Sequence, residues 1–446
     1  MNEVINIAFI GGLNNANMLA GVGLGNLYIN TFGIAVYIGL NVAAGTFVSQ
    51  SIGQNDLRLA GVYLNRGRIV SFISFVPIFI AMIYSDKFFG LLNQDPQAVE
   101  YAYTYILYMI PYLLLHQQFD LTRTFLACFN KTTVTMITQI FSTFLHFCFC
   151  YYFVKVQNMN LRGVALSGMI TMLFNVLATT FYIKVYLKEL SPAFFLPNKQ
   201  SFMGIPAYMK LAVSSMCIYC LEWWAMEVIT IIASQISINQ LGAQVIILNI
   251  YYVYMSLGYG LSYASEILIG KCIGANNIKE GKEYRRIIMQ VGFALSALAM
   301  LTFYAFRYFL AEFFTPIIEI QDYIIQVGTL SSFCLFFELS QAWLQGFLRG
   351  LGTYNHALVT VLIAFYCLMI PLAYYLAIVL KMQLFGIWIA LTSGQITLCL
   401  MYVYLSHSLY DWQKISDEVQ VRAEIENNQK VKDSDMRTFK ESLIES

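Results

Sequence analysis

Charged residues are scarce in this sequence. Asp, Glu, Lys and Arg together make up 11% of its 446 residues, whereas about a quarter of a soluble globular domain is charged. Apolar residues make up 59% of the chain, and its mean hydropathy is +0.63. This composition excludes an ordinary soluble domain and predicts an integral membrane protein that crosses the bilayer many times.

Residue patterns that would indicate other functions are also missing. The formal net charge is +1, and no basic face is present, which argues against a nucleic-acid partner. There is no Walker lysine motif, and the glycines at 21–25 follow no predicted strand, so transport driven by ATP is not expected. The four histidines are scattered and Cys217 and Cys220 lie in one apolar run, so we expect neither a metal site nor another cofactor. No nucleophile elbow or catalytic triad suggests an enzyme.

Apolar runs of helical length recur along the chain and predict eleven complete membrane spans. These lie near 26–51, 67–92, 98–123, 134–154, 163–187, 209–234, 244–270, 285–310, 322–349, 355–380 and 384–406. The apolar stretch at 1–12 has about half the length that a span needs, which predicts a truncated first helix. The tail, 407–446, is polar, charged and almost without aromatic residues, so we expect it to be disordered.

Lys and Arg are distributed unevenly between alternate loops and helix ends, which predicts the orientation of the chain. Of the 26 basic residues, fifteen fall on one side, five on the other and six in the tail. The richer side, which includes Arg66 and Arg349 at helix ends, should face the cytosol together with the tail. The sequence does not distinguish a plasma-membrane location from a vacuolar or vesicular one.

An internal repeat is visible at a nearly constant offset. GLNVAAGTFVSQSIGQNDL at 39–57 aligns without gaps with GLSYASEILIGKCIGANNI at 260–278, an offset of 221 residues. Two shorter matches follow, of 125–133 with 347–355 and of 161–166 with 384–389. Six spans separate equivalent points, so the halves have the same orientation and form parallel repeats, whose interface is where a transporter places its substrate site.

The repeat divides the chain into two lobes. We expect a first lobe at 1–187, a cytosolic linker at 188–207 that contains KELSPAFFLPNKQ, and a second lobe at 208–406. The cytosolic tail at 407–446 follows them.

Several motifs in register resemble those of the multidrug and toxic compound extrusion (MATE) transporters, particularly their eukaryotic branch. They are LAGVGLGN (19–26), GLNVAAGTFVSQSIGQNDLRLAGVYLNRG (39–67), LEWWAMEV (221–228), QLGAQVI (240–246) and FELSQAWLQGFLRGLG (337–352). The resemblance implies an all-α membrane protein with the twelve-helix MATE fold, in which two six-helix lobes face each other across a central cavity. It also implies export of organic cations and xenobiotics in exchange for protons or sodium ions.

The resemblance assigns roles to particular residues. Glutamates in the seventh helix of eukaryotic members match Glu222 and Glu227, and an acidic residue in the tenth helix matches Glu338; these are implicated in cation exchange. The sequence departs from the family pattern at Gly45, where relatives commonly have aspartate, and at Asn249, where some have glutamate. From the resemblance we expect the protein to be a monomer that lies in the lipid bilayer and binds small organic cations.

The depth of two of these carboxylates supports the assignment independently. Glu222 lies twelve residues after Lys210, and Glu338 lies eleven before Arg349. At 1.5 Å per residue both are roughly 17 Å from the cytosolic boundary, near the middle of a core about 30 Å thick. A carboxylate removed from water is harder to ionise, so a cationic substrate can compete with a proton for it.

Glu227 is expected to act differently from Glu222. Five residues separate them, which places their side chains roughly 140° apart around a straight helix. We therefore predict that they do not share one face, with Glu222 in the cavity and Glu227 as a secondary contact or a partner inside the lobe. Glu266, only five residues before Lys271, is expected to be solvated near the surface.

Further candidates for the substrate cavity are aromatic and amide side chains. The aromatic rings could offer π faces to a cation, while the amides could bind substrate or join helices by hydrogen bonds. This set is Trp223, Trp224, Tyr252, Asn41, Gln50 and Asn249.

Three alternative functions remain open at this stage. Sodium could replace the proton as the coupling ion. A lipid-linked oligosaccharide flippase of a related fold is also possible, although such flippases typically line their cavity with arginine and lysine. The third alternative is a remnant that no longer transports.

Overall fold

The computed structural model describes residues 2–13, 15–91, 95–409, 411–426 and 428. Within these residues the chain is helical and contains no strand. Eleven helices or helix pairs are long and apolar enough to cross a membrane, which confirms the predicted number of complete spans.

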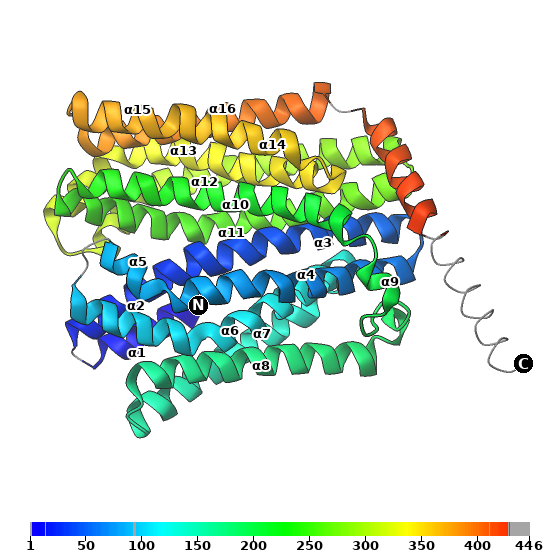
Figure 1. Ribbon diagram of the computed structural model, residues 1–446. Coiled ribbons are helices and arrows are strands. Elements are labelled where there is room, and N and C mark those ends of the chain that lie inside the picture. Colours follow the sequence, from blue (N-terminus) through cyan, green and yellow to red (C-terminus); the bar gives the residue numbers. More distant parts are fainter. Residues whose placement is uncertain (1, 14, 92–94, 410, 427, 429–446) are drawn as a thin grey trace, which may run out of the picture. The chain divides into compact units, whose positions relative to one another are not determined.

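The spans use most of the helices that Figure 1 labels. They are α2 (Ala16–Ile29) continued by α3 (Ala35–Gly53), α4 (Leu57–Ile83), α6 (Pro96–Cys128), α7 (Thr132–Cys150), α8 (Asn160–Tyr186), α10 (Ile205–Ser234), α11 (Ile238–Gly274), α12 (Ile278–Phe314), α13 (Ile318–Leu351), α14 (Tyr354–Val361) continued by α15 (Ile370–Tyr374), and α16 (Gln383–Tyr404). Shorter helices are α1 (Asn2–Gly11), α5 (Ser85–Leu91) and α9 (Lys199–Phe202).

The internal repeat is confirmed by the backbone conformation. Left-handed residues recur at equivalent places: Asn55 and Asn276 have φ of 59° and 54°, and Asn130 and Gly352 have φ of 59° and 76°. Two more pairs, Asn158 with Lys381 and Asn160 with Gln383, share this conformation. Non-glycine residues adopt it rarely, so its recurrence at offsets of 221 to 223 residues indicates that both halves fold in the same way.

The helices form two compact units. The first comprises residues 1–48 and 57–220, and the second comprises 49–56 and 221–446. The last turn of α3 thus belongs to the second unit, although the rest of α3 belongs to the first. These units are defined by their internal contacts, and the lobe and linker boundaries given above stay a prediction.

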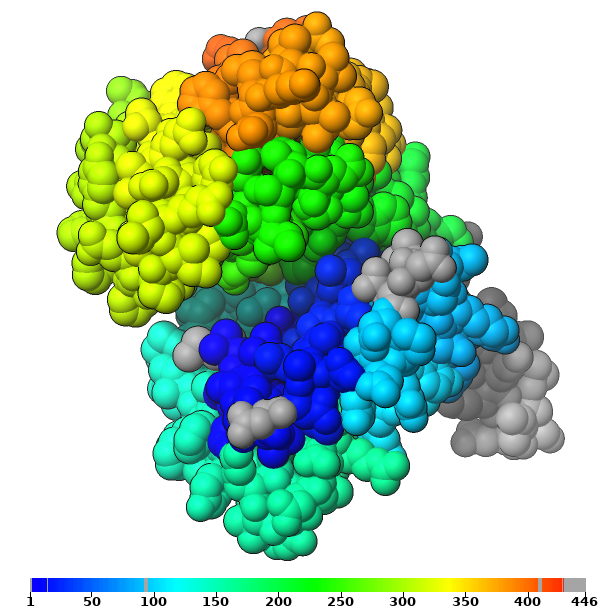
Figure 2. All heavy atoms as spheres, turned by 90° about the vertical axis from the view of Figure 1, so that its left-hand side faces the viewer, coloured from blue at the N-terminus to red at the C-terminus, as the bar shows by residue number. Residues whose placement is uncertain are grey.

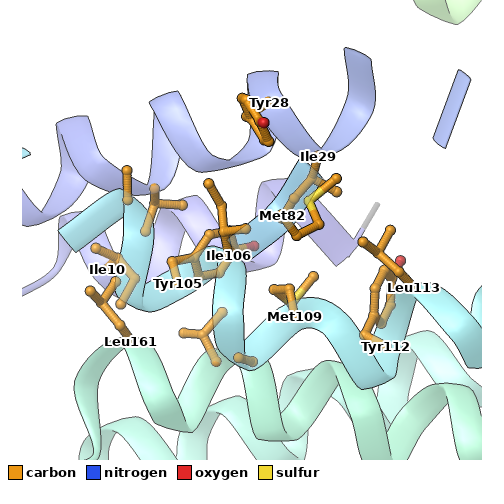
Figure 3. Close-up of a cluster of buried hydrophobic side chains, with 14 of the residues drawn as sticks. Ile10, Tyr28, Ile29, Met82, Tyr105, Ile106, Met109, Tyr112, Leu113 and Leu161 are labelled. Atoms are coloured by element: carbon orange, nitrogen blue, oxygen red, sulfur yellow. The ribbon is translucent and has the colours of Figure 1, made fainter. Parts of the chain in front are cut away.

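The first unit is held together by an apolar core in which helices from distant parts of the sequence meet. Ile10 of α1, Tyr105 and Ile106 of α6, and Leu161 of α8 belong to this buried cluster (Figure 3). Within it α6 packs against α2, α4 and α8. Close packing of this kind fixes helices because voids and overlaps both cost free energy.

In the second unit α13 is the central element, since it packs against α11, α12 and α16. In Figure 2 the atoms of this unit, from green to orange, are packed together. Trp343 of α13 is completely buried, and its indole nitrogen donates to Ser296 Oγ of α12 at 3.4 Å. This hydrogen bond lies in an otherwise apolar contact between α12 and α13 and helps to fix the register of the two helices.

The sequence prediction for the tail is wrong in part. The tail is not wholly disordered, because residues 412–426 form a helix, here called the tail helix, at the right-hand end of Figure 1. Its Trp412 and Val419 are buried, which a count of aromatic residues could not reveal. Arg66 and Arg349 are buried as well; Arg66 donates to the Gln200 carbonyl, and Arg349 donates to Gln345 of its own helix.

The contact between α12 and α13 yields a test of the packing. A side-chain carbon added at Gly292 would lie 2.6 Å from the Trp343 ring, whereas one added at Gly260 of α11 would meet nothing within 4 Å. We expect Gly292→Ala to destabilise the protein by about 1–3 kcal/mol and Gly260→Ala to leave stability unchanged or raise it slightly. Thermal unfolding in detergent measures both, and equal melting temperatures for the two variants would contradict the packing.

Candidate functional site

A row of polar side chains follows one face of α13. Glu338, Gln341, Gln345 and Arg349 are separated by three or four residues, and this spacing places them on adjacent turns of the same helix face. α13 is therefore the element that positions this polar row.

Glu222 of α10 is hydrogen-bonded to this row. Gln345 Nε2 donates to Glu222 Oε1 at 2.7 Å, and Arg349 donates to the side-chain oxygen of Gln345. The phenol of Tyr402, on α16, lies 3.5 Å from the same Gln345 nitrogen. A buried carboxylate is costly unless it is hydrogen-bonded, and the Gln345 amide, itself bound by a guanidinium, supplies that bond to Glu222.

Near these residues the second unit contains a cavity of about 80 Å³. Glu222, Glu227 and Glu338 all line it. The other lining residues are Trp223, Met226, Leu248, Tyr251, Tyr252, Met255, Tyr259, Gln341, Phe365 and Gln395. Drug-sized ligands occupy pockets of about 300–1,000 Å³, so this cavity in its present form has room for ions and a few water molecules only.

Glu227 lines the same cavity as Glu222, as the predicted secondary contact would. Both reach the cavity, although their Cβ directions differ by roughly 140° on a straight helix. Trp223 and Met226 lie between them on the helical wheel and also line the cavity. The cavity thus faces the arc between the two glutamates, and each long side chain borders it from one side.

The aromatic candidates separate into two groups. Trp223 and Tyr252 line the cavity, as does Tyr251, which is buried and donates its phenol proton to the Ser331 carbonyl. Trp224 is 38% exposed and is not among the lining residues. Asn249 is also absent from the lining and donates to the carbonyl of Val245 in its own helix at 2.8 Å. Of the four predicted cavity residues in α10 and α11, only Trp223 and Tyr252 therefore line the cavity.

Two amide candidates lie elsewhere. Asn41, in the first unit, is buried and donates to Asp120 Oδ2 at 3.0 Å and to the Gln117 carbonyl at 3.3 Å, so it connects α3 with α6. Asp120 in turn forms an ion pair with Arg123, which lies three residues later in the same helix. Gln50 is buried at the end of α3, where its Nε2 donates to the Gly350 carbonyl at 3.1 Å.

Glu266 was expected at the surface but is only 1% exposed. Its helix, α11, packs closely against α13, and a side-chain carbon at Gly350 would lie 2.8 Å from the Glu266 carbonyl oxygen. Closeness in sequence to Lys271 is therefore a poor guide to the depth of Glu266, because α13 covers this residue.

Comparisons with known proteins identify the family. The MatE family profile matches residues 1–152 and 215–375. The chain belongs to the MatE family. Among curated relatives it is 25% identical to multidrug and toxin extrusion protein 1 of Xenopus tropicalis, over 94% of this chain and 73% of that protein. It is 24% identical to multidrug and toxin extrusion protein 2 of Mus musculus, over 96% of this chain and 74% of that one.

Solved MATE structures share the fold. The eukaryotic MATE transporter AtDTX14 is similar with a TM-score of 0.88 and 21% identity, over 94% of each chain. A transporter of the MOP superfamily from Pyrococcus furiosus, described as having a binding pocket of reverse polarity that suggests a different function, has a TM-score of 0.81 and 16% identity over 94% of this chain and 92% of that chain. The MATE fold of this multi-pass membrane transporter is thereby established.

Sequence reasoning missed several residues of the site. Gln345 is the direct partner of Glu222, and its position seven residues after Glu338 was a signal, since that spacing returns to the same helix face. Gln341 carries the same signal at three residues. Gln395 of α16 lines the cavity but has no sequence signal, because only the packing of α16 against α13 brings it there.

The Glu222–Gln345 bond can be tested through stability. Gln345→Met keeps the side-chain volume but removes the donor to Glu222 and the acceptor for Arg349, so we expect a loss of about 1–3 kcal/mol. Gln341→Met is the matched control, because the Gln341 side-chain oxygen has no protein partner among the described residues, and it should be neutral or slightly stabilising. Thermal unfolding of both variants in detergent decides, and an equal effect would contradict the assigned bond.

Proposed function

We propose that this MATE transporter exports organic cations in exchange for protons, with Glu222 and Glu338 as the exchanging carboxylates. The observation that carries the proposal is that both carboxylates, on different helices, line one small cavity in the second unit. Glu227 borders the same cavity and serves as an additional acidic contact.

The chemistry of the lining supports a cationic substrate. The lining residues include three glutamates and no Lys or Arg. Trp223, Tyr252 and Tyr259 add aromatic faces, which attract cations through the ring quadrupole. A related fold with reverse pocket polarity exists, so the fold alone does not choose the cargo; here the acidic lining favours an organic cation over an anionic lipid-linked oligosaccharide.

The exchange follows from competition for the carboxylates. An ionised Glu222 or Glu338 attracts a cation, and a protonated one does not, so binding of a proton on the outer side weakens the hold on the cargo. Loss of that proton to the cytosol restores the negative charge for the next cation. Because the cavity of about 80 Å³ is smaller than a drug-sized ligand needs, the cargo requires more space than this conformation of the second unit offers.

Sodium is a second candidate as the coupling ion. Besides the carboxylates, the side-chain oxygens of Gln341 and Gln395 line the cavity without a protein partner among the described residues. Hard cations in proteins are bound by carboxylate and amide oxygens of this kind. Under proton coupling, neutral carboxylic acids would instead donate hydrogen bonds to these oxygens.

Efflux of ethidium from proteoliposomes tests the proposal. With an imposed pH gradient, the wild-type protein should move ethidium, and Glu222→Gln together with Glu338→Gln should abolish that movement, because an amide cannot exchange a proton. Glu319→Gln, at an exposed position hydrogen-bonded to Asn239 at 2.6 Å, is the control and should keep wild-type transport. Ethidium movement unaffected by the double substitution would overturn the proposal.

The pH dependence of binding gives a separate measure. Ethidium binding to the detergent-solubilised protein should weaken as the pH falls, because the carboxylates that attract the cation become protonated. The Glu222→Gln, Glu338→Gln variant should bind weakly at every pH.

Replacing the pH gradient by a sodium gradient in the proteoliposome assay then identifies the coupling ion, since only the gradient of that ion should drive ethidium transport.

A further inference from the structure

Two glycines that are equivalent in the internal repeat form a reciprocal contact. A side-chain carbon at Gly53 would lie 2.1 Å from the Lys271 carbonyl oxygen, and one at Gly274 would lie 1.9 Å from the Gln50 carbonyl oxygen. Gly53 aligns with Gly274, and Gln50 with Lys271, at the offset of 221 residues. The ends of α3 and α11 thus touch through their backbones, related as the two repeats are, and only glycine permits this approach.

The tail helix lies on this contact and binds both of its sides. On the α11 side, Ser416 Oγ donates to the Ile273 carbonyl and Gln420 Nε2 to the Gly274 carbonyl, each at 2.7 Å. The last carbonyls of a helix have no partner within it, so these side chains cap α11. On the α3 side, Gln54 Nε2 donates to the Val419 carbonyl at 3.1 Å, and Arg422 donates to the side-chain oxygen of Gln50.

Two further contacts fix the beginning of the tail helix and the position of Gln50. A side-chain carbon at Gly281 of α12 would lie 3.2 Å from the Trp412 ring, and the Arg285 guanidinium lies 5.7 Å from the centre of that ring. Gln50, which accepts from Arg422, donates to the Gly350 carbonyl near the end of α13. The tail helix is therefore connected, directly or through Gln50, to the ends of α3, α11 and α13 and to the first turns of α12.

These contacts have a mechanical consequence. The ends of α3 and α11 cannot separate without breaking either the bonds of Ser416 and Gln420 or those of Gln54 and Arg422. Residues 49–56 belong to the second unit, so all of these contacts lie within that unit. These restraining contacts are hydrogen bonds, and water can replace each of them when the helix ends separate.

We propose that the tail helix is a latch that holds the ends of α3 and α11 together, and that Ser416, Gln420 and Arg422 are positioning residues for the transport cycle. The predicted topology places this latch on the cytosolic side. Its effect on transport rests on the proposed function, whereas its effect on the contact between the helix ends does not. Releasing the latch increases the fraction of protein in which α3 and α11 are apart.

A native thiol lies next to the start of the tail helix and reports on release of the latch, because Cys272 and Trp412 meet at Gly281. Cys272, two residues before Gly274, is buried, and its Cβ lies 3.2 Å from the position of a side-chain carbon at Gly281. In the full-length protein in detergent, we expect the Ser416→Ala, Gln420→Ala, Arg422→Ala variant to react with N-ethylmaleimide at Cys272 at least about tenfold faster than wild type, because it loses three hydrogen bonds and each one lost favours opening severalfold. Peptide mass spectrometry measures the rate at each cysteine, and Trp412 is left in place so that no static cover is removed.

Two controls keep this test sharp. Lys414→Ala with Glu418→Ala changes the exposed side of the same helix and should leave the Cys272 rate unchanged. Cys334 and Cys399 are buried within the second unit and must stay unreactive, which separates opening from unfolding. If the triple variant unfolds, Arg422→Ala alone is used, with a smaller expected increase.

The outcomes distinguish the latch from the proposed function. An unchanged Cys272 rate in a folded latch variant overturns the latch, whatever the transport assay gives. A faster Cys272 rate supports the latch even if no ethidium is transported, in which case only the proposed function fails. If the latch and the proposed function are both correct, the latch variant should also change the rate of ethidium efflux. The control variant, Lys414→Ala with Glu418→Ala, should not change that rate.

Discussion

The second unit depends on the need to give a hydrogen-bond partner to the charge of Glu222 at membrane depth. Glu222 obtains one from Gln345, which is in turn bound by Arg349. An amide between a carboxylate and a guanidinium separates the two charges while satisfying both, so neither is left alone in a medium of low dielectric constant. This arrangement sets α10 against α13 and leaves Glu338 and Gln341, farther along the same face, directed to the cavity.

α13 connects the cavity with the helix ends. Glu338 lines the cavity, and the Gly350 carbonyl, a little over three turns later, accepts the hydrogen bond from Gln50. Arg349, next to Gly350, holds the partner of Glu222. A change at the carboxylates and a change at the tail helix therefore act on one continuous helix, which gives the two sites a shared physical element. Trp343, buried between them against α12, fixes the position of that helix.

Much of this architecture could be predicted from the sequence because a membrane restricts the possible folds. Backbone polar groups in lipid must be paired within the segment, so apolar runs of sufficient length become helices, and eleven spans were counted correctly. The repeat was also readable, since equivalent turns need the same backbone conformation at Asn55 and Asn276. Predictions failed where distant elements cover a residue: Glu266 is buried against α13, and Trp412 and Val419 of the tail helix are buried.

The sequence by itself determined the spans, the repeat, the family resemblance and the presence of acidic residues near the middle of the membrane, because hydrophobic length, offset and composition are local or periodic properties. Only the tertiary structure decided which side chains meet. It brought Glu227 to the cavity beside Glu222, kept Trp224 and Asn249 out of the lining, and assigned Gln50 to the helix ends. These choices depend on the approach of separate helices, set by glycine contacts and buried hydrogen bonds that no single segment encodes.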